Sequence, residues 1–264
     1  MEKPVTNRPV GFICEPLLHD YPDHVSACYT PAKPPEKPDP AIYSQEEQLA
    51  LGLEVAWDSP DITTNHFSPW RLFEEPEVKV RNLSPDTNAI NVLVNFYTSL
   101  FGIGTSRHFL SAQVVNLGPQ QEALLTYPLS QEIINGDQRI GVHVIIEHPY
   151  DSNRDNNRGS QVVSGAYTSE AGRQQTIQFP VVNSTANHSQ INLSVLQNDV
   201  SASVTPATHY FAPWEQITAT LTMLVPSFLH GAPGADLLRY VTVVGRDPGG
   251  DLVDGLTHIL RIND

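Results

Sequence analysis

The sequence is short of charge, and above all of positive charge. Charged residues make up 17% of the 264 residues, and 15 Lys and Arg stand against 29 Asp and Glu, which gives a formal net charge of −14. Nucleic-acid backbones and anionic membrane surfaces are bound through clustered Lys and Arg. The sequence holds no Lys/Arg run longer than isolated pairs. We therefore expect no nucleic acid and no anionic lipid among the partners.

Long apolar runs are also missing. No segment reaches the ~18 to 20 apolar residues that a membrane-spanning helix needs. The first residues, Met1-Glu2-Lys3-Pro4, lack the apolar stretch of a secretory signal. We expect a protein that is cytoplasmic at synthesis and that either stays there or becomes part of a released or cell-surface particle.

Recognisable catalytic motifs are absent from the sequence. It contains no His-Glu-x-x-His, no Gly-x-Ser-x-Gly, no phosphate-binding loop and no dinucleotide-binding glycine pattern. The ten histidines are scattered along the chain. These observations favour a protein that is not an enzyme and that needs no cofactor.

Proline and short alternating apolar runs are abundant. The 22 prolines mark turns and strand ends, which favours an all-β chain. Residues 217–225 alternate apolar side chains with threonines, and residues 89–97 place Val92, Val94 and Phe96 on one side. Alternation with a period of two puts one set of side chains in a core and the other in water. Similar short segments recur to the end of the chain, with no helical period of useful length.

This pattern predicts an all-β protein with two immunoglobulin-like β-sandwiches in tandem behind an extended Pro-rich N-terminal arm. The arm covers residues 1–45, a connector covers 46–75, and the sandwiches cover 76–164 and 174–264. Five of the ten residues from Pro31 to Pro40 are prolines, which favours polyproline-like backbone without internal hydrogen bonds. Such an arm is either solvated or laid on a surface, of its own body or of a neighbouring subunit. Ser44 and Glu47 have the spacing of a helix N-cap.

Both halves resemble known bacterial domains. The first half resembles the cell-adhesion-related domain called CARDB, in Val78-Lys-Val-Arg-Asn-Leu-Ser-Pro, in Ala89-Ile-Asn-Val-Leu-Val-Asn-Phe-Tyr and in Glu147-His-Pro-Tyr-Asp-Ser-Asn-Arg-Asp-Asn-Asn. The second half looks like the immunoglobulin-like domains found in tandem in bacterial surface and structural proteins, in Phe179-Pro-Val-Val-Asn, Val204-Thr-Pro-Ala and Ala212-Pro-Trp-Glu. The resemblance implies a β-sandwich fold and transfers no catalytic residue.

Four residues near the N-terminus form a candidate metal site. Cys14, His19, His24 and Cys28 follow the spacing C-x4-H-x4-H-x3-C. Two thiolates and two imidazoles suit a tetrahedral Zn²⁺, although the spacing is not that of a standard zinc finger. A Cys14–Cys28 disulfide and two unpaired thiols are the alternatives.

A second candidate site alternates Asp151, Asn153, Asp155 and Asn157 along a loop. Side-chain oxygens at every second position suggest Ca²⁺, but the Gly and Glu of an EF-hand loop are missing at the corresponding positions. The favoured alternative is a turn in which Asn and Asp side chains bond their own backbone.

Aromatic residues suggest a third candidate site. Trp70, Tyr210 and Trp214 suit a surface on which a sugar ring stacks, and the favoured alternative is that they seal the ends of the sandwiches. A glycan is therefore a candidate ligand.

Taken together, the residues indicate a non-enzymatic structural or interaction protein. We expect a subunit or accessory of a larger protein assembly, such as a phage-tail-like particle, a capsid or a surface layer. The N-terminal arm and the sandwich faces would dock on protein partners, the arm by adding to a sheet edge. An adhesive or carbohydrate-binding module is the alternative.

Overall fold

The computed structural model describes residues 13–14, 28–29, 36–63, 77–127, 140–162, 167–170, 172–197, 200–225 and 237–263. The chain divides into two compact units, residues 1–36 and 37–264. In the first unit, β1 (Ile13–Cys14) pairs antiparallel with β2 (Cys28–Tyr29). All packing described below lies in the second unit.

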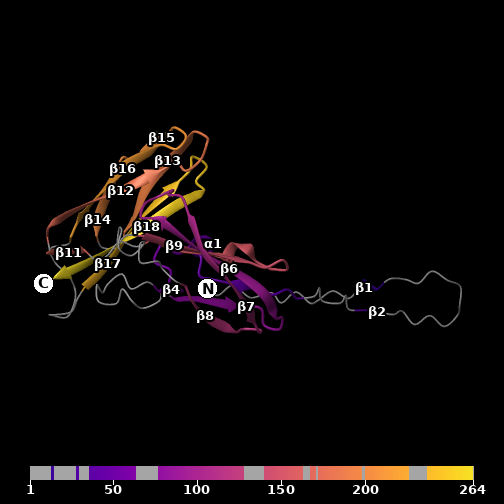
Figure 1. Ribbon diagram of the computed structural model, residues 1–264. Coiled ribbons are helices and arrows are strands. Elements are labelled where there is room, and N and C mark those ends of the chain that lie inside the picture. The colour runs from indigo at the N-terminus through magenta and orange to yellow at the C-terminus, as the bar shows by residue number, and fades with distance from the viewer. Residues whose placement is uncertain are drawn as a thin grey trace, which may run out of the picture. The chain divides into compact units, whose positions relative to one another are not determined.

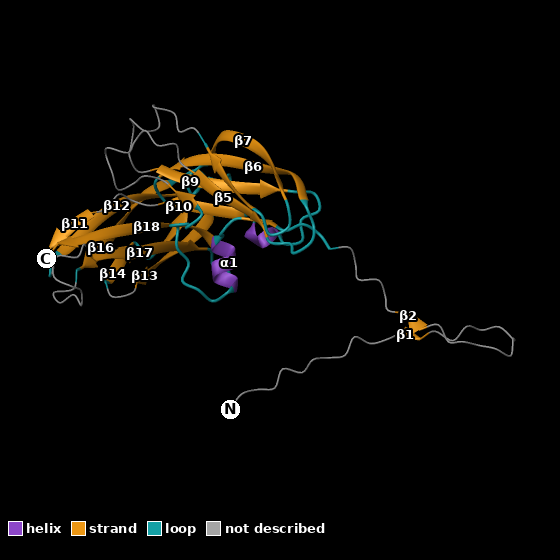
Figure 2. Ribbon diagram, turned by 90° about the horizontal axis from the view of Figure 1, so that it is seen from below, coloured by secondary structure: helices purple, strands orange, loops and turns teal. Residues whose placement is uncertain are grey.

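The first sandwich consists of two antiparallel sheets. In one sheet, β5 lies between β8 on one side and the short strands β3 and β4 on the other. Its strands are β3 (Pro40–Ala41), β4 (Ile62–Thr63), β5 (Glu77–Asn82) and β8 (Glu122–Thr126). The other sheet has the order β10-β9-β6-β7, which Figure 2 shows from below. Its strands are β6 (Ala89–Leu100), β7 (His108–Leu117), β9 (Ile140–Glu147) and β10 (Arg158–Val162).

Apolar side chains at every second position of the strands form the core of the first sandwich. Val92, Val94 and Phe96 of β6 are fully buried, as predicted, and the ring of Phe96 stacks on Tyr127 with centroids 5.1 Å apart. Side chains of this kind contribute about 1.5 to 3 kcal/mol each when they leave water. The helix α1 (Gln45–Ala50) lies between β3 and β4 along the chain, and the predicted N-cap is confirmed, because Ser44 Oγ accepts a hydrogen bond of 2.9 Å from Glu47 N.

The second sandwich also has two sheets, drawn in orange to yellow in Figure 1. One has the order β12-β16-β14, with β12 (Gln174–Val182), β14 (Ser201–Thr205) and β16 (Gln216–Leu224). The other has the order β11-β18-β17-β13-β15. Its strands are β11 (Tyr167–Glu170), β13 (Ser189–Gln197), β15 (Thr208–Phe211), β17 (Leu237–Arg246) and β18 (Leu252–Asn263). The pair β11–β18 is parallel.

The Thr-rich strand predicted from alternation is β16. Its residues Ala219, Leu221 and Met223 are fully buried in the second core, while the threonines between them are only partly covered. The only α-helix of the described ranges is α1, with a 3-10 turn, η1 (Arg154–Asn156), before β10. The predicted all-β, immunoglobulin-like fold is confirmed, whereas the boundaries of the arm, connector and sandwiches stay predictions.

In each sandwich, a buried asparagine stands at the end of the corresponding strand. Asn82 follows Val80 and Arg81 at the end of β5, and its Nδ2 donates to Thr87 O at 2.7 Å and Gly118 O at 3.0 Å. Its Oδ1 accepts from the backbone N–H groups of residues 39 and 84.

Asn183 repeats this arrangement after β12. Its Nδ2 donates to Asn187 O at 2.6 Å and to Ala212 O at 2.9 Å, and its Oδ1 accepts from Thr185. Both asparagines also donate their backbone N–H to the residue that precedes the paired strand, Gln121 or Glu215, at 2.9 Å. The two sandwiches are thus built on one local plan, which the repeated strand-then-Asn pattern of the sequence indicates.

The last residues before the helix lie on the first sandwich. Leu83 N donates to Asp39 O at 2.8 Å, Ser152 N to Pro38 O at 3.0 Å, and Ile42 N to Asn156 O at 2.9 Å. Ile42 is fully buried. The sequence left open whether the arm lies on its own body or on a neighbouring subunit. The C-terminal end of the arm lies on its own body.

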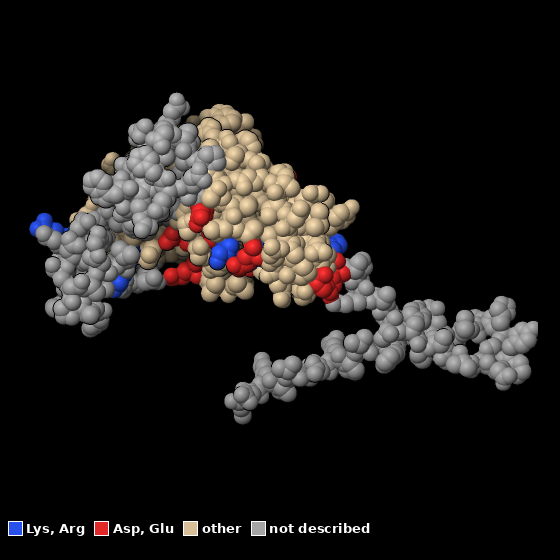
Figure 3. Space-filling model, turned by 60° about the horizontal axis from the view of Figure 1, so that its bottom comes forward, with Lys and Arg blue, Asp and Glu red and all other residues tan. Residues whose placement is uncertain are grey.

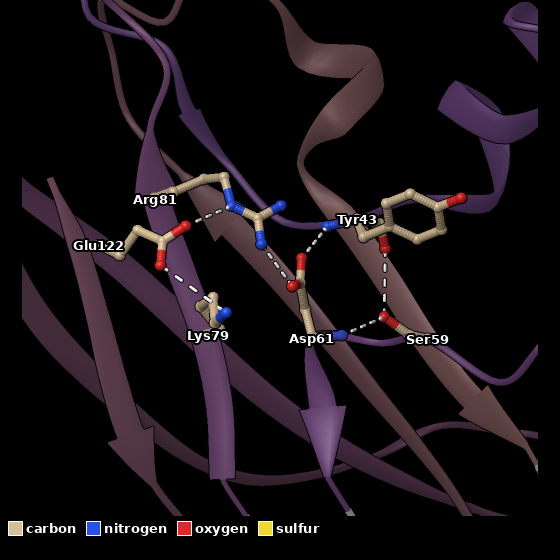
Figure 4. A network of polar contacts seen from close by, with 6 residues as sticks. All are labelled: Tyr43, Ser59, Asp61, Lys79, Arg81 and Glu122. Carbon is tan, nitrogen blue, oxygen red and sulfur yellow. Dashed lines mark hydrogen bonds and ion pairs between the residues drawn. The ribbon is translucent and has the colours of Figure 1, made fainter. Parts of the chain in front are cut away.

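A polar network fixes the segments on both sides of the helix to the same sheet (Figure 4). Asp61 accepts from Tyr43 N at 2.7 Å and pairs with the guanidinium of Arg81. Glu122 of β8 lies 3.5 Å from Arg81 Nε and 3.7 Å from Lys79 Nζ. The pair Asp61–Arg81 is the buried part of the network, and the exposed Glu122 contacts contribute less because water screens them.

The repeated asparagines give a stability prediction. Asn82→Ala and Asn183→Ala each leave buried backbone carbonyls and amides without partners, and we expect each to lower the free energy of unfolding by about 2 to 4 kcal/mol. Asn187→Ala is the control, because that side chain is exposed, and should cost less than about 0.5 kcal/mol. Urea denaturation measures all three; equal losses for buried and exposed asparagines would contradict the structural role.

Candidate functional site

A short loop of the first sandwich enters the core of the second. The loop follows β6, and its residues Phe101 and Ile103 are 3% and 0% exposed within the second core. Ile103 N donates to Pro180 O at 3.0 Å, and Val182 N donates to Ile103 O at 2.9 Å. Gly104 has φ +69°, and a Cβ there would lie 2.3 Å from Val182 O, so the close approach requires glycine.

Trp57 enters the same core from the connector. It is 2% exposed, its N–H donates to Thr257 Oγ1 at 3.0 Å, and its carbonyl accepts from Val162 N at 2.8 Å. A Cβ on Gly255 would lie 2.4 Å from the indole ring. Residues of the connector and of the first sandwich therefore complete the core of the second sandwich, and we call the region formed by Trp57, Phe101 and Ile103 the joint.

The carboxylate of Asp254 ties three backbone segments together at the joint. Its oxygens accept from Gly104 N at 3.0 Å and Gly255 N at 2.9 Å, and the side chain of Trp57 donates to it as well. Burial raises the pKa of Asp254, while the positive charge of Arg107 and these hydrogen bonds oppose the rise. The group acts as an acceptor for the joint and is already fully used by these donors.

A pocket of about 230 Å³ lies beside the joint. It is lined by Arg107 and Arg158, by the acids Glu46 and Asp254, and by the buried His143, among others. Two basic and two acidic residues line this small pocket, so its charge favours neither an anionic nor a cationic ligand.

His143 is the one histidine of this pocket, and its ring lies between two buried hydroxyls. One ring nitrogen is 2.8 Å from Ser99 Oγ and the other is 2.9 Å from Ser160 Oγ. Burial, and to a smaller extent the positive charge of Arg107, together lower the pKa of His143 to about 3. A general base works best when its pKa lies near the working pH. His143 is therefore a poor base, and its neutral ring serves to join β6, β9 and β10.

The outer face of the sheet β10-β9-β6-β7 is apolar toward β7. Phe109 and Val114 are 61% and 62% exposed, and Tyr97 packs edge-on against Phe109 with centroids 5.7 Å apart. The register places Leu93 beside Val114 and Asn95 beside Ala112 on this face. We call the patch of Leu93, Tyr97, Phe109, Ala112 and Val114 the outer face.

Among the described strands, β7 is also a sheet edge. It pairs with β6 on one side and with no described strand on the other, over ten residues that include no proline, Lys, Arg, Asp or Glu, and its Gln113 Nε2 donates to Thr126 O at the end of β8. Edge strands are ordinarily protected from further pairing by charges, prolines or short length. An uncharged edge of this length next to exposed apolar side chains is suited to receive another strand.

The aromatic residues of the second sandwich do not seal its end. Tyr210 and Trp214 are each 66% exposed, which contradicts the expectation that they pack inward. The ring of His188 stacks on Tyr210 with centroids 5.7 Å apart, and Trp214 has φ +62° in the turn between β15 and β16. Trp70 lies outside the described residues. We call His188, Tyr210 and Trp214 the aromatic group.

The predicted metal ligands are placed only in part. Cys14 and Cys28 are opposite each other in the pair β1–β2, whereas His19 and His24 lie outside the described residues. Zinc, a disulfide and free thiols all stay hypotheses. Within the described ranges, no group of three or more His, Cys, Asp or Glu has the arrangement of a metal site.

The alternating Asp/Asn loop forms a turn. Asp151 Oδ1 accepts from Asn153 N at 3.0 Å, and Asn153 Oδ1 accepts from Asp155 N at 3.2 Å. These bonds from a side chain to the backbone two residues on are those of the favoured alternative. The four residues do not converge as a linear calcium loop. What the sequence did not reveal is that Asp39, far away along the chain, lies against this turn.

No helix among the described residues is long and apolar enough to cross a membrane.

No protein-family model and no curated protein matches the chain. Similar solved structures include SSP-19 of Caenorhabditis elegans, an MSP-domain protein-like family member, at 12% identity over 38% of this chain and 94% of that one, with a TM-score of 0.26. The PapD-like domain 7 of human CEP192 is 11% identical over 38% of this chain and 79% of that one, with a TM-score of 0.27.

A third similar structure, a protein of unknown function from Porphyromonas gingivalis W83, covers both sandwiches. It is 14% identical over 72% of this chain and 92% of that chain, with a TM-score of 0.25. Similarities this low carry no functional argument. The CARDB-like resemblance of the first sandwich is tested by none of these structures and stays a prediction.

His143 gives a pH-dependent prediction. An unfolded histidine has a pKa of about 6.5, so the unfolded chain takes up a proton first as the pH falls, and the stability present above pH 6.5 is lost toward pH 3. Between pH 7 and pH 5 this group should cost about 2 kcal/mol of unfolding free energy. In His143→Gln that part of the acid destabilisation should disappear.

The control is His108→Gln, which removes an exposed histidine outside the joint. Urea denaturation at several pH values measures the three proteins. If the wild type and His143→Gln lose the same stability between pH 7 and pH 5, the buried neutral imidazole is not the cause.

Proposed function

We propose that this protein is a non-enzymatic structural and interaction subunit, or accessory, of a larger protein assembly such as a phage-tail-like particle, a capsid or a surface layer. The observation that carries the proposal is strand β7, whose uncharged edge lies beside the apolar outer face. The occupant we propose is an extended, uncharged segment of a partner protein that adds as a fifth strand next to β7.

An extended, uncharged segment suits this edge because it would gain hydrogen bonds and bury apolar side chains without the desolvation of a charge. Backbone N–H and C=O groups on the open side of β7 would gain partners, and Phe109 and Val114 would lose water. Because β7 carries no Lys, Arg, Asp or Glu, no ionic group has to be desolvated. A charged partner strand would form the same backbone hydrogen bonds but would lose free energy through desolvation of its own ionic groups.

The negative charge of the remaining surface favours docking at the edge of β7 over docking elsewhere. Figure 3 shows a face of the body on which acidic side chains gather in groups with few basic ones beside them. With a formal net charge of −14, copies of the chain repel one another over most of their surface. At the edge of β7, which carries no Lys, Arg, Asp or Glu, this repulsion is weaker. The rigid joint would hold that edge at a constant angle to the second sandwich.

The assembly role is tested by site-specific photo-crosslinking in the source organism. A crosslinker at Ala112, on the outer face of β7, should join the chain to one defined protein in a particle of fixed stoichiometry. Ser203 is the control, because it is an exposed residue on β14, another edge strand. Equal labelling at both positions, or a chain that sediments only as a free monomer, would refute the proposal.

A charge substitution gives the quantitative form of the test. Val114 is 62% exposed, so Val114→Lys should fold normally, but docking a partner strand would bury its ammonium group. We expect recovery in the particle to fall at least about tenfold, which corresponds to ~1.4 kcal/mol. Val114→Thr, which keeps the β-branched shape without a charge, should retain most of the incorporation.

The aromatic group favours a second candidate function, an adhesive or carbohydrate-binding module. Tyr210 and Trp214 offer exposed rings, and Glu215 and His209, which are 3.2 Å apart, supply polar groups nearby. Faces of aromatic rings are apolar and suit the C–H faces of sugars, while the polar groups would bind hydroxyls.

A glycan array with the purified monomer tests this alternative. If the module binds a glycan, Trp214→Ala should reduce binding at least about tenfold without lowering the thermal midpoint, since the ring is exposed. The control is Tyr150→Ala, which removes an aromatic side chain that is 69% exposed on the first sandwich. The absence of any glycan binding by the wild type removes the alternative.

A further inference from the structure

The only two cysteines of the chain stand opposite each other in one strand pair. In the first compact unit, β1 pairs antiparallel with β2, as Figure 1 labels them. The register sets Ile13 opposite Tyr29 and Cys14 opposite Cys28. This pairing takes no part in the docking proposed for β7, so the two can be tested separately.

Opposite residues of an antiparallel pair have the spacing that a disulfide requires. Their Cα atoms lie about 4.5 to 5.5 Å apart, according to whether the position is hydrogen-bonded. A disulfide joins residues whose Cα atoms are usually about 4.4 to 6.8 Å apart. Opposite residues also belong to the same face of the ladder, because the side-chain direction alternates along both strands. The register of Cys14 and Cys28 therefore meets the backbone requirement for a bond between them.

Strands as short as β1 and β2 need additional stabilisation. Each has two residues, and even an ordinary isolated hairpin is at best marginally stable in water. A disulfide across the pair would enclose residues 15–27 in a loop. A crosslink that closes a loop of about fifteen residues removes entropy from the open state and favours the closed state on the order of 100-fold. A covalent bond at this position would supply what the short ladder lacks.

We propose that Cys14 and Cys28 form an intramolecular disulfide when the chain meets a small disulfide oxidant such as oxidised glutathione. The thiolate of one cysteine attacks a sulfur of the oxidant and releases one glutathione thiolate, which leaves a mixed disulfide. The thiolate of the other cysteine then attacks the protein sulfur of the mixed disulfide and releases the second glutathione. The cysteines lose two electrons and two protons, and one oxidised glutathione becomes two reduced molecules.

The bond would control how far the N-terminus reaches. A fully extended chain from Cys14 to Cys28 spans roughly 46 to 50 Å, at about 3.3 to 3.6 Å per residue. The disulfide holds the two Cα atoms within about 7 Å of each other. Oxidation therefore shortens the greatest reach of residues 1–13 by on the order of 40 Å. Because reducing compartments keep thiols reduced and oxidising ones join them, the arm would respond to the compartment that contains the chain.

Thiol–disulfide exchange in the full-length chain tests the proposal. The protein is reduced, freed of reductant, equilibrated with defined ratios of reduced to oxidised glutathione, quenched with acid and analysed by mass spectrometry. The oxidised chain should be monomeric, lighter by two hydrogen atoms and unreactive toward a maleimide, and its peptide map should contain a Cys14–Cys28 link. Cys14→Ser and Cys28→Ser should form only mixed disulfides with glutathione.

An exchange of two neighbouring residues provides the matched control. The double variant Cys28→Tyr, Tyr29→Cys keeps the composition, but its second cysteine stands opposite Ile13, on the other face of the ladder. The loop grows by one residue, which hardly changes the entropy of closure. We expect the equilibrium constant for disulfide formation against glutathione to be at least about tenfold lower in the variant, because a shift of one position reverses the face.

Three results would overturn the proposal. Equal equilibrium constants for the wild type and the exchanged variant would mean that the register does not bring the cysteines together. Oxidation that yields only glutathione-capped thiols or crosslinked dimers would exclude the intramolecular bond. One zinc ion per purified chain, released when the thiols are modified, would assign both cysteines to a metal site.

Discussion

The burial of Trp57, Phe101 and Ile103 in the core of the second sandwich is the contact on which the rest of the body depends. These side chains come from the connector and from a loop of the first sandwich, and each contributes about 1.5 to 3 kcal/mol by leaving water. Two backbone hydrogen bonds of Ile103 and the acceptor Asp254 fix the direction of approach. Because these residues anchor the first sandwich in the core of the second, we expect the edge of β7 and the aromatic group to keep a constant relation to each other.

The strands could be predicted because alternation records which side of a strand is buried. The prediction that Val92, Val94 and Phe96 point into the core is confirmed, and the Thr-rich pattern correctly predicted strand β16. Phe101 and Ile103 could not be placed in this way. Ile103 stands between Gly102 and Gly104 in a segment that the sequence predicts as a turn, and its backbone partners, Pro180 and Val182, are about eighty residues further along the chain. No local period reports a contact of that kind.

The alternating Asp/Asn loop shows the same limit of prediction from the sequence. The sequence drew attention to Asp151 and Asn157, but it grouped them with their neighbours at every second position, which in fact bond the backbone. Asp39 also lies against this turn, and only the folded chain brings it there. Trp214 was misjudged for a different reason. Its φ of 62° is unusual for a residue other than glycine, and its ring is exposed at a turn where we expected it to pack inward.

Strand β10 has a mechanical consequence. It begins two residues after Asn156, which is hydrogen-bonded to Asp39 and Ile42 of the N-terminal segment, and it ends at Val162, which is 1% exposed in the second core. Tension applied to that segment therefore passes along one short strand into the joint, in the plane of its hydrogen bonds to β9. Under load the body would behave as a stiff coupling between whatever holds its N-terminus and whatever lies on its far sandwich.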